Sequence, residues 1–457
     1  MNASPKTESV AALVAPASTG SAAAIYQLWA LGAVTAALTL ATPFAYRIGG
    51  DNYYMAMTIP VGLAALMATR IAERAPIRKA LGFIIVVAIL LRGFLLFTEP
   101  LLSTDIYRYV WDGKVQAAGI NPYRYVPAHE ALAALRDTTI FPNINRADYG
   151  VTIYPPVAQM FFFIVTRLSE NVTVMRLAML GCDAVTAAVI GLLLLRMGQP
   201  MTRLVAYVWH PLPMWEIANN GHIDALMMAL LMLGLWLALT TRLLPGAAAI
   251  TFGMLAKPLA VVALPAIWRP WDWKMPAIAI AIVGACYLPY LPVGAGVLGF
   301  LADGYLSEEG LSSGNYVWPL VAWRALAGIV PHDVEIYFMG VALALGALAI
   351  IAMRRSPRSI ELSLADIKRM LLVALLLLSP NYPWYFLVIV PFVALTGGAP
   401  AWAATIGALL LQEEAGWGEF VPLLVRKSLL YAAVLAACGY TIWQMWNRAH
   451  FERKTLS

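Results

Sequence analysis

Long apolar runs constrain this chain more than any other feature. Runs of roughly 18 to 24 residues recur from Ile25 to Trp446, and that length lets an α-helix cross about 30 Å of hydrocarbon. Apolar residues make up 61% of the chain and charged residues only 12%, whereas soluble domains are about a quarter charged. A soluble multidomain protein is therefore excluded, and an all-α polytopic membrane protein is predicted.

The apolar runs predict about thirteen to fourteen transmembrane helices, several of them short and flanked by proline. We place them near residues 25–47, 53–72, 78–97, 172–196, 203–218, 223–241, 245–256, 258–268, 274–292, 332–352, 368–380, 383–397, 401–412 and 423–446.

Basic residues in the connections between these helices predict the orientation of the chain. They gather after the second, fourth, tenth and last helices, as Arg70, Arg74, Arg78, Lys79, Arg196, Arg203, Arg354, Arg355, Arg358, Lys368, Arg369, Arg448, Arg453 and Lys454. Because basic connections favour the cytoplasmic side, both termini are expected in the cytoplasm. The long hydrophilic loop 99–171 and the loop 293–314 then face the extracytoplasmic side.

Two further classes of partner are excluded by composition. The chain has no basic run of the kind that binds nucleic acid. Its three cysteines, Cys182, Cys286 and Cys438, lie far apart within apolar runs, so we expect neither a disulfide nor a metal site from them.

The loop 99–171 begins with a segment, 105–116, that favours a helix with Ser103 or Thr104 as its N-cap. Arg108 lies three residues after Asp105 and four before Asp112, so the three side chains share one helix face. A carboxylate just outside the membrane can act as a general base toward a hydroxyl. The alternatives are that Asp105 caps the helix, or that Arg108 and Asp112 form a weak surface pair.

The same loop continues with a short apolar stretch. Tyr154, Pro155 and Pro156 precede residues 157–165, which are apolar but too few to cross the membrane. We expect this stretch to be a helix lying in the membrane interface.

Polar residues also interrupt the apolar runs at two later points. The turn 218–224 contains His222 and Asp224, although Asp224 can also serve simply as a helix cap. Lys257 precedes Pro258 inside an apolar run. A lysine at that depth should face a cavity or a partner, and the proline should end the helix so that the chain turns back there. The alternative is a long crossing helix whose lysine reaches the interface.

A third polar and aromatic turn, 379–385, includes Asn381 and Tyr382, and Arg92 adds a cation near the outer end of its helix. The predicted constellation is an anion-binding site of two cations beside two carboxylates: Arg92, Lys257, Asp105 and Asp224.

Five segments in this order resemble a known family: DIYRYVWDGKVQAAGINPY, TIYPP, NGHIDALM, LAKPLA and LSPNYPWYF. They look like bacterial C-type (GT-C) glycosyltransferases that use polyprenyl-phosphate sugars, and are most similar to the polyprenol-phosphate-mannose-dependent α-mannosyltransferases. The resemblance implies a GT-C fold, places Asp105 at the position of the base in the first large outer loop, and places Lys257 at a phosphate-contacting position. Two departures are the helices before residue 76 and His210, where an Asn before the Pro is expected.

On this resemblance we predict Asp105 and Asp224 as catalytic residues. The predicted substrate-binding residues are Arg92, Arg108, Asp112, Tyr154, His222, Lys257, Asn381 and Tyr382. The predicted parts are a disordered cytoplasmic N-terminus (1–24), two extra N-terminal helices (25–75), the catalytic core module (76–300, with the loop 99–171) and a C-terminal transmembrane module (301–457).

The resemblance implies the inverting transfer of a sugar, which in the most similar enzymes is mannose. The sugar moves from a polyprenyl-phosphate donor to a hydroxyl of a lipid or glycan acceptor. A departing phosphate needs fixed positive charge, and the acceptor needs a base. We expect no cofactor. The many carboxylates leave a divalent metal as the alternative, which a monophosphate donor does not favour. The expected location is a bacterial inner membrane, with the active site facing the periplasm or exterior. The alternatives are a lipid-carrier transporter or flippase, and a non-catalytic membrane subunit.

Overall fold

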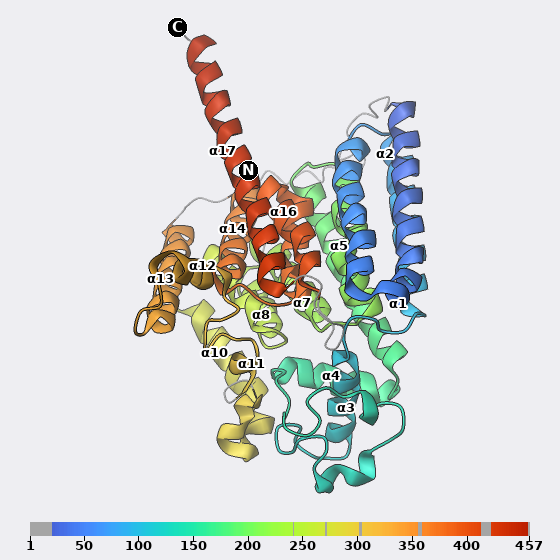
Figure 1. The fold of residues 1–457 in the computed structure, drawn as a ribbon, viewed down its shortest axis with the longest axis vertical. Helices are drawn as coiled ribbons and strands as arrows, with labels where there is room; N and C mark the ends of the chain where they lie inside the picture. The colour runs from blue at the N-terminus through green and yellow to red at the C-terminus, as the bar shows by residue number, and fades with distance from the viewer. Residues whose placement is uncertain are drawn as a thin grey trace, which may run out of the picture.

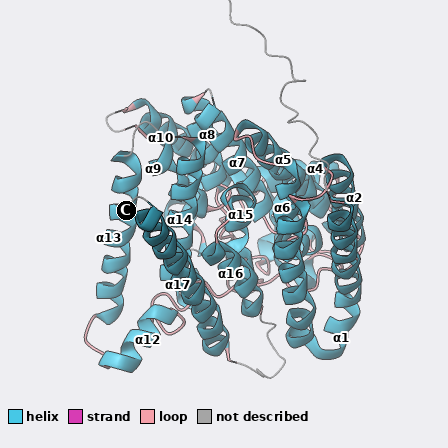
Figure 2. Ribbon diagram, turned by 90° about the horizontal axis from the view of Figure 1, so that it is seen from above, coloured by secondary structure: helices cyan, strands magenta, loops and turns pink. Residues whose placement is uncertain are grey.

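The computed structural model describes residues 21–240, 242–269, 272–300, 304–354, 359–412 and 422–455. Residues 1–20 of the segment predicted to be disordered lie outside this part of the chain. In the described part every regular element is a helix and none is a strand (Figure 2). The predicted all-α class is therefore confirmed.

The α-helices are α1 (Ala22–Ala72), α2 (Ile77–Leu96), α3 (Asp105–Ala117), α4 (Pro156–Leu168), α5 (Val172–Arg196), α6 (Val205–Val208), α7 (Asp224–Thr240), α8 (Leu243–Met254), α9 (Leu264–Ile267), α10 (Lys274–Tyr287), α11 (Leu306–Glu308), α12 (Trp318–Ala327), α13 (Asp333–Arg354), α14 (Ile360–Leu378), α15 (Val390–Thr396), α16 (Ala399–Gly407) and α17 (Leu423–Thr455). Tighter or wider helical turns are η2 (Glu130–Leu135), η3 (Phe141–Asn143), η4 (Met201–Leu204), η5 (Pro213–Asn219), η6 (Pro258–Ala263), η7 (Leu288–Leu298), η9 (Pro383–Ile389) and η10 (Ala408–Leu411).

Helix α1 is a hairpin of two arms (Figure 1). Its backbone leaves the helical region at Gly49 and Gly50, where Gly50 has φ +58°, a conformation that glycine adopts without steric cost. The two ends of α1 meet, because the Ser21 N–H donates to the Arg74 carbonyl at 3.0 Å. The two helices predicted at 25–47 and 53–72 are thereby confirmed.

Among the described residues six helices are long and apolar enough to cross a membrane, or seven when η5 and α7, which are bent by 118° relative to each other, count as one broken span. The protein is thus a multi-pass membrane protein. This number is lower than the thirteen to fourteen predicted, for two reasons. The two arms of α1 count once, and five apolar helices have only 10–17 residues. Proline cuts these segments short, and a 12-residue helix such as α8 rises only about 18 Å.

Burial is greatest at the centre of the helix bundle. Side chains of α6, η5 and the first half of α7, such as Tyr207, Trp215 and Met228, are inaccessible to solvent. Outer helices instead present apolar side chains outward, including Ile280 on α10 and Leu343 on α13, which are 73% and 69% exposed. Such exposure is what hydrocarbon around a membrane protein would cover.

Helices α3 and α4 lie together below the bundle in Figure 1 and confirm the two helices predicted within the loop 99–171. Tyr109 of α3 stacks on Phe162 of α4, with ring centroids 4.5 Å apart. The segment that leads into α3 is held by the bundle, because the Leu101 and Leu102 amides donate to the side-chain oxygens of Asn219 and Asn220 at 3.0 and 3.1 Å. The start of α3 is therefore held at one end of the bundle.

Candidate active site

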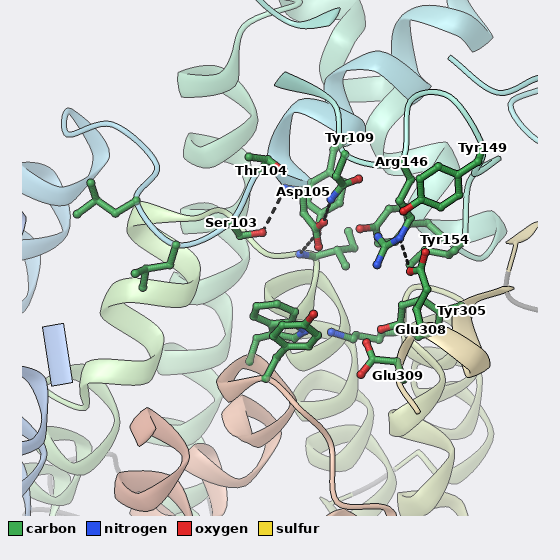
Figure 3. A pocket seen from close by; sticks show the side chains of 18 residues that line it. Ser103, Thr104, Asp105, Tyr109, Arg146, Tyr149, Tyr154, Tyr305, Glu308 and Glu309 are labelled. Carbon is green, nitrogen blue, oxygen red and sulfur yellow. Dashed lines mark hydrogen bonds and ion pairs between the residues drawn. The ribbon is translucent and has the colours of Figure 1, made fainter. Parts of the chain in front are cut away.

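A cavity of about 520 Å³ lies where α3 meets the bundle (Figure 3). Its lining comes from both halves of the chain. The N-terminal half supplies residues within 101–109 and 145–154, together with Ile223 and Lys257. The C-terminal half supplies residues within 305–309, together with Tyr382 and Trp384. Segments far apart in the sequence thus form one polar chamber.

Asp105 is the first residue of α3, and its carboxylate reaches this cavity. The Asn145 amide donates to one carboxylate oxygen at 2.5 Å, and Nδ1 of His222 lies 3.9 Å from the other. The side chain keeps 18% exposure. The structure therefore leaves the carboxylate oriented but accessible, as a general base requires.

Lys257 lines the same cavity and forms an ion pair with Asp224. The distance from Lys257 Nζ to the Asp224 carboxylate is 2.6 Å, and the lysine is 17% exposed while the aspartate is 1% exposed. Helix α8 ends at Met254, and the Lys257 backbone is extended. The prediction that the chain turns at Lys257 is confirmed, and the long crossing helix is wrong. The buried aspartate holds an ammonium that still faces the cavity.

His222 is buried between two carboxylates. Its Nε2 lies 3.3 Å from Glu216 Oε2, and its ring stacks on Trp384 with centroids 4.5 Å apart. Trp384 in turn stacks on Tyr382, at 4.3 Å. Of these residues Tyr382 and Trp384 line the cavity, so His222 contacts the site through Asp105 and this aromatic stack.

Arg146 and Glu308 close one side of the cavity and were missed in the sequence (Figure 3). Arg146 Nε donates to the Glu308 carboxylate at 2.6 Å. Burial lowers the pKa of Arg146, but the hydrogen bond to Glu308 and the charge of Asp105 raise it more, so the guanidinium stays charged. Its backbone has φ +55°, which is uncommon outside glycine. A pair 162 residues apart leaves no local sequence signal.

A second wall comes from the C-terminal half. Asn381 donates to the Glu309 carboxylate at 3.0 Å, and Lys427 of α17 donates to the Asn381 side-chain oxygen at 2.7 Å. Lys427 also donates to the carbonyls of Tyr316 and Ser379. Burial raises the pKa of Glu309. Asn381, which was predicted to bind substrate, is not among the described residues that line the cavity. It instead donates to Glu309, which does line the cavity.

Arg108 and Asp112 form a closed pair instead of a binding site or a surface pair. Their side chains are 4% and 2% exposed and 2.8 Å apart, and Gln159 donates to the second oxygen of Asp112. Neither is among the described lining residues. Tyr154, in contrast, does line the cavity, and burial followed by the charge of Asp105 raises the pKa of its phenol, which therefore stays protonated.

Arg92 is likewise engaged elsewhere. Its Nε donates to Asp183 at 2.6 Å and its Nη1 to the Val208 carbonyl at 2.7 Å. It is not among the described residues that line the cavity, so the structure does not group Arg92 with Lys257. His210 is also buried away from the cavity, with Nε2 3.1 Å from Thr405 Oγ1.

Within the described ranges, no group of three His, Cys, Asp or Glu side chains is arranged to hold a metal ion. The cavity offers three carboxylates, Asp105, Glu308 and Glu309, and two cations, Arg146 and Lys257. This combination can bind an anionic group at one point and accept a proton at another.

Comparison with known proteins gives two relatives and a family. Alpha-(1->6)-mannopyranosyltransferase A of Mycobacterium tuberculosis is 26% identical over 367 residues, which are 77% of this chain and 66% of the relative. The protein of the same name from Corynebacterium glutamicum is 28% identical over 180 residues, which are 38% of this chain and 36% of the relative. The matched regions thus span just under two thirds of the first relative and about a third of the second. No solved structure matches the chain.

A family model described as the N-terminal domain of alpha-(1->6)-mannopyranosyltransferase matches residues 10–272. This range contains α3, the loop after it, Asp224 and Lys257, and so includes the cavity-lining residues from Leu101 to Lys257. Because it covers more than half of the 457 residues, the chain belongs to the alpha-(1->6)-mannopyranosyltransferase (MptA_B) family.

Proposed function

We propose that this protein is a membrane mannosyltransferase that moves mannose from a polyprenyl-phosphate donor to a hydroxyl of a lipid or glycan acceptor. The observation that carries the proposal is the accessible Asp105 carboxylate in one cavity with the ammonium of Lys257. The family, which is described as alpha-(1->6)-mannopyranosyltransferase, supports mannose as the transferred sugar. The two charges match the two needs of the reaction, which are a base for the acceptor and a cation for the leaving phosphate.

In this mechanism the acceptor oxygen attacks the anomeric carbon of the donor and forms the new glycosidic bond. The bond from that carbon to the phosphate oxygen breaks, and its electron pair leaves with the polyprenyl phosphate. The acceptor proton passes to Asp105. Lys257, held by Asp224 at 2.6 Å, offsets the charge of the leaving phosphate. One displacement inverts the configuration, so a β-linked donor gives an α-linked product.

Asp224 therefore has a positioning role in the proposed reaction, since its carboxylate is 1% exposed and paired to Lys257. We expect the protein in the bacterial inner membrane with this cavity on the periplasmic or outer side. The support is the cluster of Arg70, Arg74, Arg78 and Lys79. It lies at the N-terminal end of α2, whereas the cavity lining begins just after the C-terminal end of that helix, and basic connections favour the cytoplasm.

The test is an assay of the purified chain with radiolabelled polyprenyl-phosphate mannose and a membrane lipid extract, with and without EDTA. We expect release of free polyprenyl phosphate that falls by about 10²–10⁴-fold in Asp105→Asn. The matched control is Asp148→Asn, which alters an exposed aspartate of the same loop and should keep the wild-type rate. Activity that survives EDTA would support a reaction without a divalent metal.

Three outcomes would count against parts of the proposal. Full activity of Asp105→Asn would exclude this residue as the base. Turnover only with another polyprenyl-phosphate sugar would make the mannose assignment wrong. Lack of turnover with every lipid-linked donor would favour the transporter instead.

A further inference from the structure

A second cavity lies at the other end of the bundle from the candidate active site. Its volume is about 540 Å³, and it is bounded by the second arm of α1, the end of α15, α16 and α17. It reaches Glu73, just before α2 begins at Ile77, whereas the first cavity begins at Leu101, just after α2 ends at Leu96. The 20 residues of α2 rise about 30 Å, so the two cavities open at opposite ends of one helix.

The walls of this second cavity form a long apolar groove. On α1 it is lined by Ile59, Leu63 and Leu66, which share one helix face, and on α16 by Ala403 and Ile406. From residue 59 to residue 73 the arm of α1 rises about 21 Å, more than the roughly 15 Å of one hydrocarbon leaflet. Leu63 is 46% exposed, so the groove is accessible from the side.

Cations gather at one end of the groove. Arg70 and Arg203 line it beside one carboxylate, Glu73. Arg203 Nη1 donates to Gln199 at 2.9 Å, but its Nε is 3.6 Å from Glu73, and among the described residues that buried Nε has no hydrogen-bond partner. Lys368 reaches the same edge, where its Nζ donates to the Gly397 carbonyl at 2.5 Å.

Two glycines let the backbone at this end approach the cations closely. Gly397 and Gly398 have φ +60° and +106°, and a β-carbon on Gly398 would lie 3.2 Å from Lys368 Nζ. Two arginines therefore line the end of the apolar groove beside one carboxylate, and Lys368 adds a third positive charge next to Gly397, which also lines it. A molecule that fits both parts has a hydrocarbon chain and an anionic head.

We propose that this groove binds an anionic phospholipid of the bilayer. One acyl chain lies between α1 and α16, and the phosphate lies at Arg70 and Arg203, with the charge of Lys368 next to it at Gly397. A bilayer phospholipid is the amphiphile that a laterally open groove meets at highest concentration, and a cation near an anionic lipid surface contributes about a fivefold gain in binding.

The test is native mass spectrometry of the full chain, released from bilayers of equal phosphatidylglycerol and phosphatidylcholine without any sugar donor. Wild type should retain phosphatidylglycerol over phosphatidylcholine. The Arg70→Gln/Arg203→Gln variant should retain it roughly 25-fold less. The matched control, Arg78→Gln/Lys79→Gln, removes two exposed charges in the first turn of α2 and should behave as wild type.

A second variant fills the groove without touching a charge. The Ala403→Trp variant should also lose the bound phosphatidylglycerol. If the double arginine variant fails to fold, this variant alone tests the proposal. Wild-type retention in both variants would overturn the proposal, as would equal retention of phosphatidylcholine or displacement of phosphatidylglycerol by an equal amount of polyprenyl phosphate. Because no donor is present, the result is independent of the activity of Asp105.

Discussion

Two aspartates of α3, seven residues apart, have opposite surroundings. Asp112 accepts from Arg108 at 2.8 Å through one oxygen and from Gln159 at 2.9 Å through the other, and it is buried. Asp105 accepts from Asn145 and retains 18% exposure at the cavity. A carboxylate whose lone pairs are occupied by the protein holds the fold together, whereas one with a free face can act on a ligand.

The cations differ in the same way. Arg108 is 4% exposed and donates to Asp112 and to the Gly150 carbonyl at 3.0 Å. Lys257 has one carboxylate partner, lies 4.7 Å from the Tyr385 ring and remains 17% exposed at the cavity. The closed pair, Arg108 with Asp112, and the open pair, Lys257 with Asp224, should therefore respond differently to substitution.

The largest expected effect is on stability, at the closed pair. Asp112→Ala leaves the buried Arg108 charge without its carboxylate, and breaking such a pair costs about 3–5 kcal/mol. Thermal or denaturant unfolding in detergent measures this loss. Asp148→Ala, at an exposed position, should change the free energy of unfolding by less than about 0.5 kcal/mol. An equal free energy of unfolding for the two variants would show that the closed pair does not stabilise the fold.

The next effect is on catalysis, at the open pair. Lys257→Gln should lower the transfer rate by about 10²–10³-fold, the loss expected when one group that stabilises developing negative charge is removed. It also leaves Asp224 buried without a cation.

The double variant Lys257→Gln/Asp224→Asn separates these two roles. It removes the unpaired charge, so thermal stability should recover while the transfer rate stays low. Recovery of the rate together with the stability would show that Lys257 only supports the fold.

A smaller effect is expected when the closed pair is replaced as a whole. Arg108→Met with Asp112→Leu substitutes apolar side chains for the ion pair, and such replacements are often neutral or stabilising. Because the Gly150 carbonyl loses its donor, we expect a free energy of unfolding within about 1–2 kcal/mol of the wild-type value. The transfer rate should stay close to that of wild type. A fall in rate like that of Asp105→Asn would mean that the closed pair also takes part in the reaction.

The smallest effect concerns pH and the second wall. Burial raises the pKa of Glu309, so the folded protein keeps a proton that the unfolded chain releases. Stability should therefore fall as pH rises from about 4.3, the ordinary value, through the raised pKa, by at most about 1.4 kcal/mol for each pH unit. Glu309→Gln should flatten this slope in melting curves between pH 4 and pH 8. An unchanged slope would show that other groups cause it.

Much of the fold was predictable from the sequence because its signals are local. Apolar length predicted α2, α5, α7 and α13, and Pro258 correctly predicted the interruption at Lys257. The number of spans is harder to predict, because apolar composition does not distinguish a short helix that ends inside the bundle from one that crosses the membrane.

The site was only partly predictable, because pairing between distant segments has no local pattern. Asp105, Lys257 and Tyr382 line the cavity as predicted, but Arg92 pairs with Asp183, 91 residues away, and Arg146 with Glu308, 162 residues away. A charge near a membrane boundary signals that it needs a partner, yet the sequence does not say whether that partner is protein or ligand.

The position of Lys427 has a consequence for biosynthesis. More than 280 residues separate Asn145, which holds Asp105, from Lys427, which holds Asn381 and through it Glu309. At a translation rate of about 5–20 residues per second, the ribosome needs roughly 14 to 56 s to synthesise that stretch. Throughout this interval the nascent chain carries the candidate base while the lysine that secures the second wall has yet to be made, so a chain interrupted before α17 has Asp105 and an unsupported Glu309.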